Sequence, residues 1–217
     1  MTINLNSTIA ILGGAGKAGR PLVQQALKAG YRVRLLLRYP EQFDLTDDRM
    51  EIIQGDARNP TSIRQLLQGC EALISTLGNP RGEGIAMLSS VTRLILLTMQ
   101  EFGISRYVVV SSYYGIGQEQ QDAKTKQAAE FMQQHFPLFM DDRKVECQLL
   151  TESDLDWTYV RLPYLVQEPA TRNIKVESAY LPGQQITVED LAGFLLNQLD
   201  NRHYIRQALF IANGTGV

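Results

Sequence analysis

Short apolar runs alternate along the chain with longer segments in which apolar residues recur every three or four positions. Runs of the first kind predict buried strands, and segments of the second kind predict amphipathic helices. Strands are expected at 8–12, 31–37, 50–54, 72–77, 106–112, 157–162 and 207–212. Helices are expected at 17–29, 59–69, 85–102, 141–153 and 187–199.

Strands that alternate with helices predict right-handed crossovers and therefore a doubly wound α/β fold with a parallel sheet. The stretches 9–12, 73–77 and 107–110 are almost continuous apolar runs, as burial on both faces of such a sheet requires. A single domain is expected over 1–217, with small substrate loops at about 113–140 and 163–186. Ligands of open parallel sheets bind beside the carboxyl ends of the strands, so these loops are expected to border a site.

Composition argues against several classes of ligand and location. The chain has 217 residues, 44% of them hydrophobic, and a net charge of −2, which argues against binding to nucleic acid. The two cysteines, Cys70 and Cys147, and the two histidines, His135 and His203, lie far apart, so neither a disulfide framework nor a metal centre is expected. No apolar run approaches 18 residues and no signal peptide is visible, which predicts no membrane span and a cytoplasmic location.

The main chemical motif is a glycine-rich segment between the first strand and the first helix. It consists of Gly13, Gly14, Ala15, Gly16, Lys17, Ala18 and Gly19. Glycines allow a tight turn and a close approach of the backbone to a pyrophosphate, while the start of the helix offers free N–H groups. At a strand-to-helix junction this pattern predicts a dinucleotide site, although a turn selected only for packing is the alternative. A mononucleotide P-loop is disfavoured because no Gly-Lys-Ser/Thr sequence is present.

The end of the second strand indicates which dinucleotide binds. Sites for NAD place an acidic residue about 20 residues beyond the glycines. Arg38 stands there instead, and an arginine can pair with the 2′-phosphate of NADP. NADP is therefore favoured over NAD, and a surface arginine without this role is the alternative.

The next two strand ends complete the predicted cofactor site. Asp56, followed by Ala57, is placed to accept a hydrogen bond from the adenine amine, or else is an ordinary loop residue before the next helix. Leu77 and Gly78 follow the fourth strand, where a glycine lets the backbone pass close to a ribose.

With these motifs the chain resembles the atypical short-chain dehydrogenase/reductase superfamily. The resemblance is to the NAD(P)H-binding branch that contains NmrA-like proteins and biliverdin IX beta (flavin) reductases. Segments 109–112, 153–163 and 186–192 extend the match over nearly the whole chain. The resemblance implies a Rossmann-type fold in which Ser111 and Pro163 also border the cofactor, but it specifies no substrate.

The usual active site of the superfamily is only partly present. That site combines a serine with a Tyr-x-x-x-Lys motif, in which the tyrosine transfers a proton. Here Tyr113 and Tyr114 are followed four residues on by Gly117 and Gln118, so the motif is absent. Lys144 either reaches the nicotinamide ribose or is a solvated helix lysine.

The biliverdin IX beta reductase pattern supplies other catalytic candidates. Its serine corresponds to Ser112, and its histidine, after the proline that ends the sixth strand, corresponds to Tyr164. Tyr113, Tyr114 and Tyr164 together predict a substrate pocket wall that stacks on a flat ring, with loop packing as the alternative.

The resulting hypothesis is an NADP-dependent oxidoreductase that transfers hydride to a small flat or carbonyl acceptor such as a quinone or flavin. A non-catalytic NADP(H)-sensing regulator of NmrA-like type is the alternative, which the missing Tyr-x-x-x-Lys motif favours. An epimerase or dehydratase is a further alternative, but the chain is short for a sugar-nucleotide enzyme. The sequence leaves the oligomeric state open.

Overall fold

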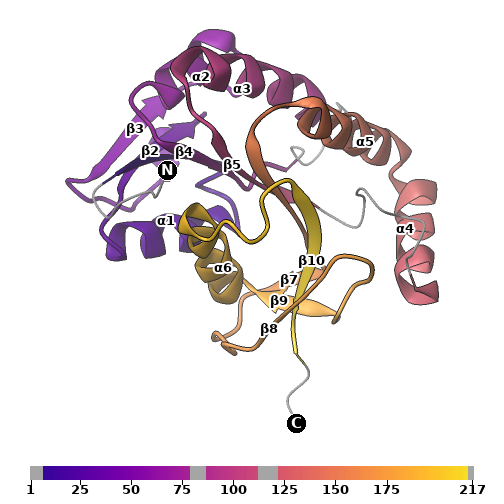
Figure 1. Ribbon diagram of the computed structural model, residues 1–217. Helices are drawn as coiled ribbons and strands as arrows, with labels where there is room; N and C mark the ends of the chain where they lie inside the picture. The colour runs from indigo at the N-terminus through magenta and orange to yellow at the C-terminus, as the bar shows by residue number, and fades with distance from the viewer. Residues whose placement is uncertain (1–6, 79–86, 112–121, 215–217) are drawn as a thin grey trace.

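The computed structural model describes residues 7–78, 87–111 and 122–214. They form three layers, with helices on both faces of a central sheet (Figure 1). The strands of this sheet are β1 (Thr8–Leu12), β2 (Arg32–Leu37), β3 (Met50–Gln54), β4 (Ala72–Ser75), β5 (Arg106–Ser111), β6 (Asp156–Arg161), β8 (Ile174–Glu177) and β10 (Gln207–Asn213). The helices are α1 (Gly19–Lys28), α2 (Pro60–Leu67), α3 (Leu88–Phe102), α4 (Ala123–His135), α5 (Pro137–Glu152) and α6 (Val188–Asp200), with a short 3₁₀ turn at Pro40–Gln42. Strands β7 (Tyr164–Val166) and β9 (Gln185–Thr187) form a separate two-stranded sheet.

The strand order of the central sheet is β3-β2-β1-β4-β5-β6-β10-β8. All neighbouring strands run parallel except β8, which pairs antiparallel with β10 at the edge. The chain moves outward from β1 to β3 and then returns to place β4 on the other side of β1. This reversal between β1 and β4 is the point at which doubly wound sheets bind their ligands. The predicted α/β class, a Rossmann-type doubly wound sheet, is confirmed.

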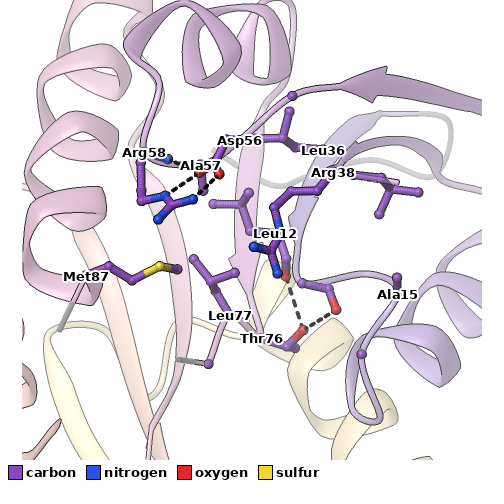
Figure 2. A pocket seen from close by; sticks show the side chains of 15 residues that line it. Leu12, Ala15, Leu36, Arg38, Asp56, Ala57, Arg58, Thr76, Leu77 and Met87 are labelled. Atoms are coloured by element: carbon purple, nitrogen blue, oxygen red, sulfur yellow. Dashed lines mark hydrogen bonds and ion pairs between the residues drawn. The ribbon is translucent and has the colours of Figure 1, made fainter. Parts of the chain in front are cut away.

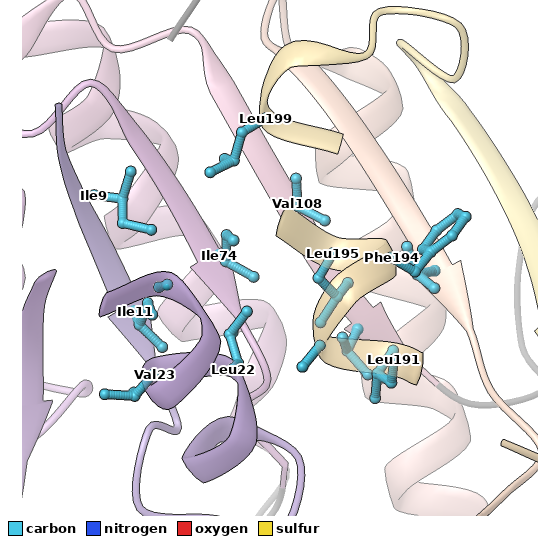
Figure 3. Close-up of a cluster of buried hydrophobic side chains, with 14 of the residues drawn as sticks. Ile9, Ile11, Leu22, Val23, Ile74, Val108, Leu191, Phe194, Leu195 and Leu199 are labelled. Carbon is cyan, nitrogen blue, oxygen red and sulfur yellow. The ribbon is translucent and has the colours of Figure 1, made fainter. Parts of the chain in front are cut away.

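Both faces of the sheet are buried, as the continuous apolar strands predict. In β1, Ile9 and Ile11 face α1 and α6, whereas Ala10 and Leu12 face α2, α3 and α5. Figure 3 shows the first of these faces, where Leu22 of α1 packs near the strands. The two helical layers therefore fix the plane of the sheet, and with it the position of the strand ends.

Several element boundaries differ from the sequence prediction. Helix α1 begins at Gly19 and not at residue 17, because the preceding residues form a separate turn and no side chain caps the helix. Strand β4 ends at Ser75, two residues early, and α5 begins four residues early at Pro137, a residue suited to the first helical position. Strand β5 ends at Ser111, the last residue described there.

The two segments expected as substrate loops contain secondary structure. Helix α4 lies in the first, and strands β7, β8 and β9 lie in the second. These strands have only three or four residues each, too few to show a periodic pattern in the sequence. Their pairing is set by tertiary contacts, so sequence periodicity did not reveal them.

Asp190 holds this second segment to the body of the protein. Its carboxylate accepts hydrogen bonds from the Thr171 and Arg172 amides at 2.8 and 3.0 Å, and from the Asn213 side chain at 2.7 Å. It also accepts one from Thr187, the residue that caps α6. Burial alone raises the pKa of Asp190, but the hydrogen bonds from Thr171 and Arg172 outweigh burial and hold the pKa below its usual value.

Asp190→Asn is expected to destabilise the protein by about 2 kcal/mol at pH 7, because a charged acceptor of several hydrogen bonds is lost. The pKa of Asp190 is lower in the folded state than in the unfolded state. The contribution of Asp190 to the free energy of unfolding is therefore complete well above pH ~4, and it disappears as the pH falls through the folded-state pKa. Urea unfolding at pH 7 and pH 3 measures the difference, with the exposed Asp154→Asn as the control. An equal loss of stability at both pH values would contradict the assignment.

Candidate functional site

The glycine-rich segment turns sharply at Gly13, where φ is +77°. An added Cβ there would also lie 2.8 Å from the backbone carbonyl carbon of Thr76. The Thr76 hydroxyl donates to the carbonyls of Leu12 and Gly13, at 3.1 and 3.3 Å (Figure 2). Only glycine meets both the conformational and the steric requirement at position 13. The hydrogen bonds from Thr76, the residue that follows β4, hold this first turn of the loop in place.

The loop then passes directly over the start of α1. A Cβ on Gly19 would lie 2.1 Å from the carbonyl oxygen of Gly13 and 2.7 Å from the Cα of Gly14. The turn between them is closed by a hydrogen bond from the Gly16 amide to the Gly13 carbonyl, at 2.9 Å. This packing brings exposed loop backbone to the positive end of the α1 dipole, which favours an anionic ligand.

A pocket of about 250 Å³ opens beside this loop, at the carboxyl ends of β1, β2, β3 and β4 (Figure 2). The pocket therefore lies at the point where the strand order reverses. Eight of the predicted cofactor residues line it: Gly13, Ala15, Gly16, Arg38, Asp56, Ala57, Leu77 and Gly78.

Charged groups gather at the β2 and β3 end of the pocket. Asp56 accepts hydrogen bonds from Arg58, from its amide at 2.8 Å, its Nε at 3.0 Å and its Nη2 at 2.7 Å. The hydrogen bonds from the Arg58 side chain hold the pKa of Asp56 below its usual value, and the positive charge of Arg38 lowers it further. Two guanidinium groups thus accompany one carboxylate, and this excess of positive charge favours an anionic ligand.

The other predicted cofactor residues surround the pocket without lining it. A Cβ on Gly14 would lie 2.9 Å from a methyl group of Leu35, so Gly14 allows the loop to pack on β2. The Lys17 ammonium donates to the carbonyl of Leu165 in β7, and Ala18 is the half-buried residue before α1.

Two further predicted residues lie at the carboxyl ends of β5 and β6. Ser111 is the last residue of β5, and its hydroxyl donates to the Tyr159 hydroxyl at 2.7 Å. Pro163 is buried two residues after the end of β6. Both positions lie along the same edge of the sheet as the pocket.

Only some of the predicted catalytic and substrate residues lie within the described part of the chain. Ser112, Tyr113 and Tyr114 lie outside the described residues. Tyr164 begins β7 and is 76% exposed. Lys144 is exposed on α5, whereas Arg143 beside it is buried, and the Arg143 Nη2 donates to the Leu77 carbonyl at 3.3 Å.

Several residues that border or support the pocket were not found from the sequence, among them Arg58, Thr76, Met87 and Arg143. Arg58 lies four positions after β3 and carries the same signal that indicated Asp56, whereas Thr76 directly follows β4 but falls inside the strand expected at 72–77. Met87 also lines the pocket, but it follows a long connection and no local pattern marks it. Arg143 belongs to a helix that is distant in sequence, so only the tertiary structure shows that it contacts Leu77.

Within residues 7–78, 87–111 and 122–214, no cluster of three or more His, Cys, Asp and Glu side chains is arranged to hold a metal ion. The helices of these ranges are too short or too polar to span a lipid bilayer.

The fold and the pocket together define a dinucleotide-binding protein of the doubly wound class: a glycine loop stands at the reversal of strand order, with charged residues at the next two strand ends. The family model of NAD(P)H-binding proteins matches residues 13–202. The chain belongs to this family, and with it to the atypical short-chain dehydrogenase/reductase superfamily.

Among curated proteins, the photosystem II assembly factor Ycf39 of Trieres chinensis is 41% identical over 70 residues, which are 32% of this chain and 22% of that protein. A protein named as a dihydroflavonol 4-reductase in Synechocystis sp. is 33% identical over 114 residues, which are 49% of this chain and 33% of that protein. The matches thus span a third or less of these relatives.

Among solved structures, a short-chain dehydrogenase/reductase from Veillonella parvula in complex with NADP has a TM-score of 0.78 and 18% identity. The superposition covers 95% of this chain and 94% of that one. At this level of identity the likeness shows a shared fold.

Proposed function

We propose that the protein is an NADP-dependent oxidoreductase that transfers hydride to a small flat or carbonyl acceptor such as a quinone or a flavin. The observation that carries the proposal is the pocket itself, which joins the glycine loop to Arg38 at the end of β2. A pyrophosphate would lie against the loop and the start of α1, and a 2′-phosphate would pair with Arg38. The NADP in the Veillonella parvula neighbour supports this choice of cofactor.

The residues of the glycine loop fit a dinucleotide. Side chains at Gly13 and Gly19 would collide with neighbouring backbone, so only glycine allows the loop to pack against β4 and α1. A loop free of side chains at these positions supports a pyrophosphate site. Asp56 is the proposed partner of the adenine amine, and Arg58 holds its carboxylate in place. NADPH, when bound, supplies the hydride, while the protein supplies binding and orientation.

The acceptor side of the site is assigned from the position of the strand ends. Ser111 and Pro163 end or follow β5 and β6, so they are proposed to border the nicotinamide. Ser112 and Tyr164 are the proposed catalytic residues, with Lys144 as a further candidate, and Tyr113 and Tyr114 are proposed to line the acceptor pocket with Tyr164. The cytoplasm remains the proposed compartment, in keeping with Cys70 and Cys147, which are both buried and form no disulfide.

Titration of the protein with NADPH and NADH, followed by fluorescence, tests the binding step. We expect NADPH to bind at least about tenfold more tightly, because Arg38 pairs with the 2′-phosphate. Turnover is then measured as NADPH oxidation against quinones, flavins and small carbonyl compounds. If neither dinucleotide binds, the proposed function is wrong.

A non-catalytic NADP(H)-sensing regulator is the second candidate. None of the nine tyrosines in the sequence is followed four residues later by lysine, so the usual proton donor of the superfamily is missing. The same experiment separates the two functions. Tight NADPH binding without oxidation by any acceptor in the panel would favour the regulator.

A further inference from the structure

We infer that Asp142 and Arg143, adjacent residues of α5, position one wall of the cofactor pocket by holding both described ends of the β4–α3 connection. The inference rests on the proposed function, because the pocket that it concerns is the proposed NADP site. Leu77 and Gly78 stand at one end of that connection and Met87 at the other, and all three line the pocket. None of these residues belongs to the central sheet or to a helix, so their positions depend on the contacts around them.

Asp142 holds the end that leads into α3. Its carboxylate accepts hydrogen bonds from the Leu88 amide at 2.7 Å, the Ser89 amide at 3.2 Å and the Ser89 hydroxyl at 2.5 Å. The residue at the N-cap position of α3 itself, Met87, offers no side-chain hydrogen bond. A carboxylate from another helix therefore satisfies the first amides of α3 and faces the positive end of its dipole.

Arg143 holds the end that follows β4. Its Nη2 donates to the Leu77 carbonyl at 3.3 Å, and its Nη1 donates to Glu146 of the same helix at 2.6 Å. Burial by itself lowers the pKa of Arg143, but the Glu146 carboxylate, together with Tyr159 and Tyr107, outweighs burial and raises the pKa above its usual value. The guanidinium is thus a fixed cation between a buried carboxylate and the pocket wall.

Glu146 is in turn fixed by two other elements. Thr92 of α3 donates to it at 3.2 Å, and Tyr159 of β6 donates to it at 3.0 Å. Tyr159 accepts a hydrogen bond from Ser111, so the network reaches the end of β5. Arg143 is therefore held rigidly, and a rigid residue that contacts the Leu77 carbonyl is able to position the pocket wall.

Arg106 provides an internal comparison. It is also a buried arginine, and it donates to the Gln198 and Asp156 carbonyls and to Thr158. It begins β5, however, so it lies at the amino edge of the sheet, opposite the edge at which the pocket opens. A substitution at Arg106 therefore removes comparable hydrogen bonds without changing the pocket wall.

The test compares Arg143→Lys with Arg106→Lys, and Asp142→Asn with Asp122→Asn. Asp122 caps α4, with its side chain accepting from the Thr125 amide. Lysine at 143 keeps a cation beside Glu146, whereas removing the charge altogether would leave a buried carboxylate unpaired and could unfold the protein. Lysine lacks the planar fork through which Arg143 contacts Glu146 and the Leu77 carbonyl with separate nitrogens. We therefore expect the Kd for NADPH to rise about tenfold in Arg143→Lys and about fivefold in Asp142→Asn. Arg106→Lys is expected to lower Tm by about as much as Arg143→Lys, whereas Asp122→Asn keeps a capping side chain. Both controls are expected to leave the Kd within about twofold.

Adenosine 2′,5′-bisphosphate is the second probe, because it carries the adenosine and the 2′-phosphate and should fill the pocket that Arg38, Leu77 and Met87 line, without a nicotinamide. Its Kd is expected to rise by the same factor as that for NADPH. Equal Kd changes in the variants and their controls, wild-type affinity in both variants, or an unchanged Kd for the bisphosphate alone would each overturn the inference.

Hydrogen exchange separates failure of this inference from failure of the proposed function. The Leu88 and Ser89 amides are expected to exchange faster in Asp142→Asn whether or not a nucleotide binds. Unchanged exchange at these amides would overturn the inference alone, whereas a wild-type protein that binds no dinucleotide would overturn the proposed function.

Discussion

Gly19→Ala is expected to abolish dinucleotide binding, with the Kd for NADPH rising at least about 100-fold. The new Cβ would lie 2.1 Å from the Gly13 carbonyl oxygen, and the nearest atoms are backbone that no rotamer change can move. The glycine loop would have to lift from α1, which separates the loop from the helix dipole. Because overpacking strains the folded state, we also expect a loss of stability of about 3 kcal/mol.

Gly193→Ala in α6 is the matched control for this variant. A Cβ at Gly193 would meet only the side-chain oxygen of Gln25, at an ordinary distance of 3.4 Å. In a helix interior, alanine is also more favourable than glycine by about 1 kcal/mol. This variant should therefore be at least as stable as the wild type. Isothermal titration with NADPH and thermal unfolding are measured on both proteins. Wild-type affinity in Gly19→Ala would contradict the role assigned to the loop.

Arg38→Ala is expected to remove the preference for NADPH over NADH. Hydrogen bonds to charged groups contribute about 1.5–3 kcal/mol, so the Kd for NADPH should rise about 10-fold to 100-fold. The Kd for NADH should change little, because NADH has no 2′-phosphate for Arg38 to bind. Parallel titrations with the two dinucleotides measure the ratio directly.

Arg32→Ala is the control for this charge change. Arg32 is an exposed arginine at the amino end of β2, whereas Arg38 follows the carboxyl end of that strand and lines the pocket. Its removal changes the net charge by the same amount and should leave both Kd values unchanged. If Arg38→Ala raises the Kd for NADPH and for NADH by the same factor, Arg38 supports the pocket but does not bind the 2′-phosphate.

The elements nearest the glycine loop were predictable because their pattern is local. Strand β1 is apolar on both faces, the glycines follow it directly, and α1 begins within the same short segment. Arg38 and Asp56 were found for a related reason, since parallel strands bring the residues after their carboxyl ends to one edge. A residue at such an end is placed by the topology, whatever its neighbours in sequence are.

Other parts of the site required distant contacts to be seen. Thr76 was not identified in advance, because its role depends on hydrogen bonds to the carbonyls of the glycine loop. Lys144 was considered in place of Arg143, because the sequence does not show which of two adjacent cations on α5 faces inward. The mixed composition of this helix gives it no clear apolar stripe, so the buried side could not be inferred from periodicity.

The sequence by itself determined the doubly wound class, the glycine loop at the first crossover and the residues that follow each strand, because periodicity and glycine conformation act over a few residues. The tertiary structure decided the rest: the antiparallel edge strand β8, the pairing of β7 with β9, the hydrogen bonds that converge on Asp190, and the contact of Arg143 with the pocket wall. Each of these joins segments that are distant along the chain. Their geometry depends on how whole layers pack, and no local pattern of residues encodes that packing.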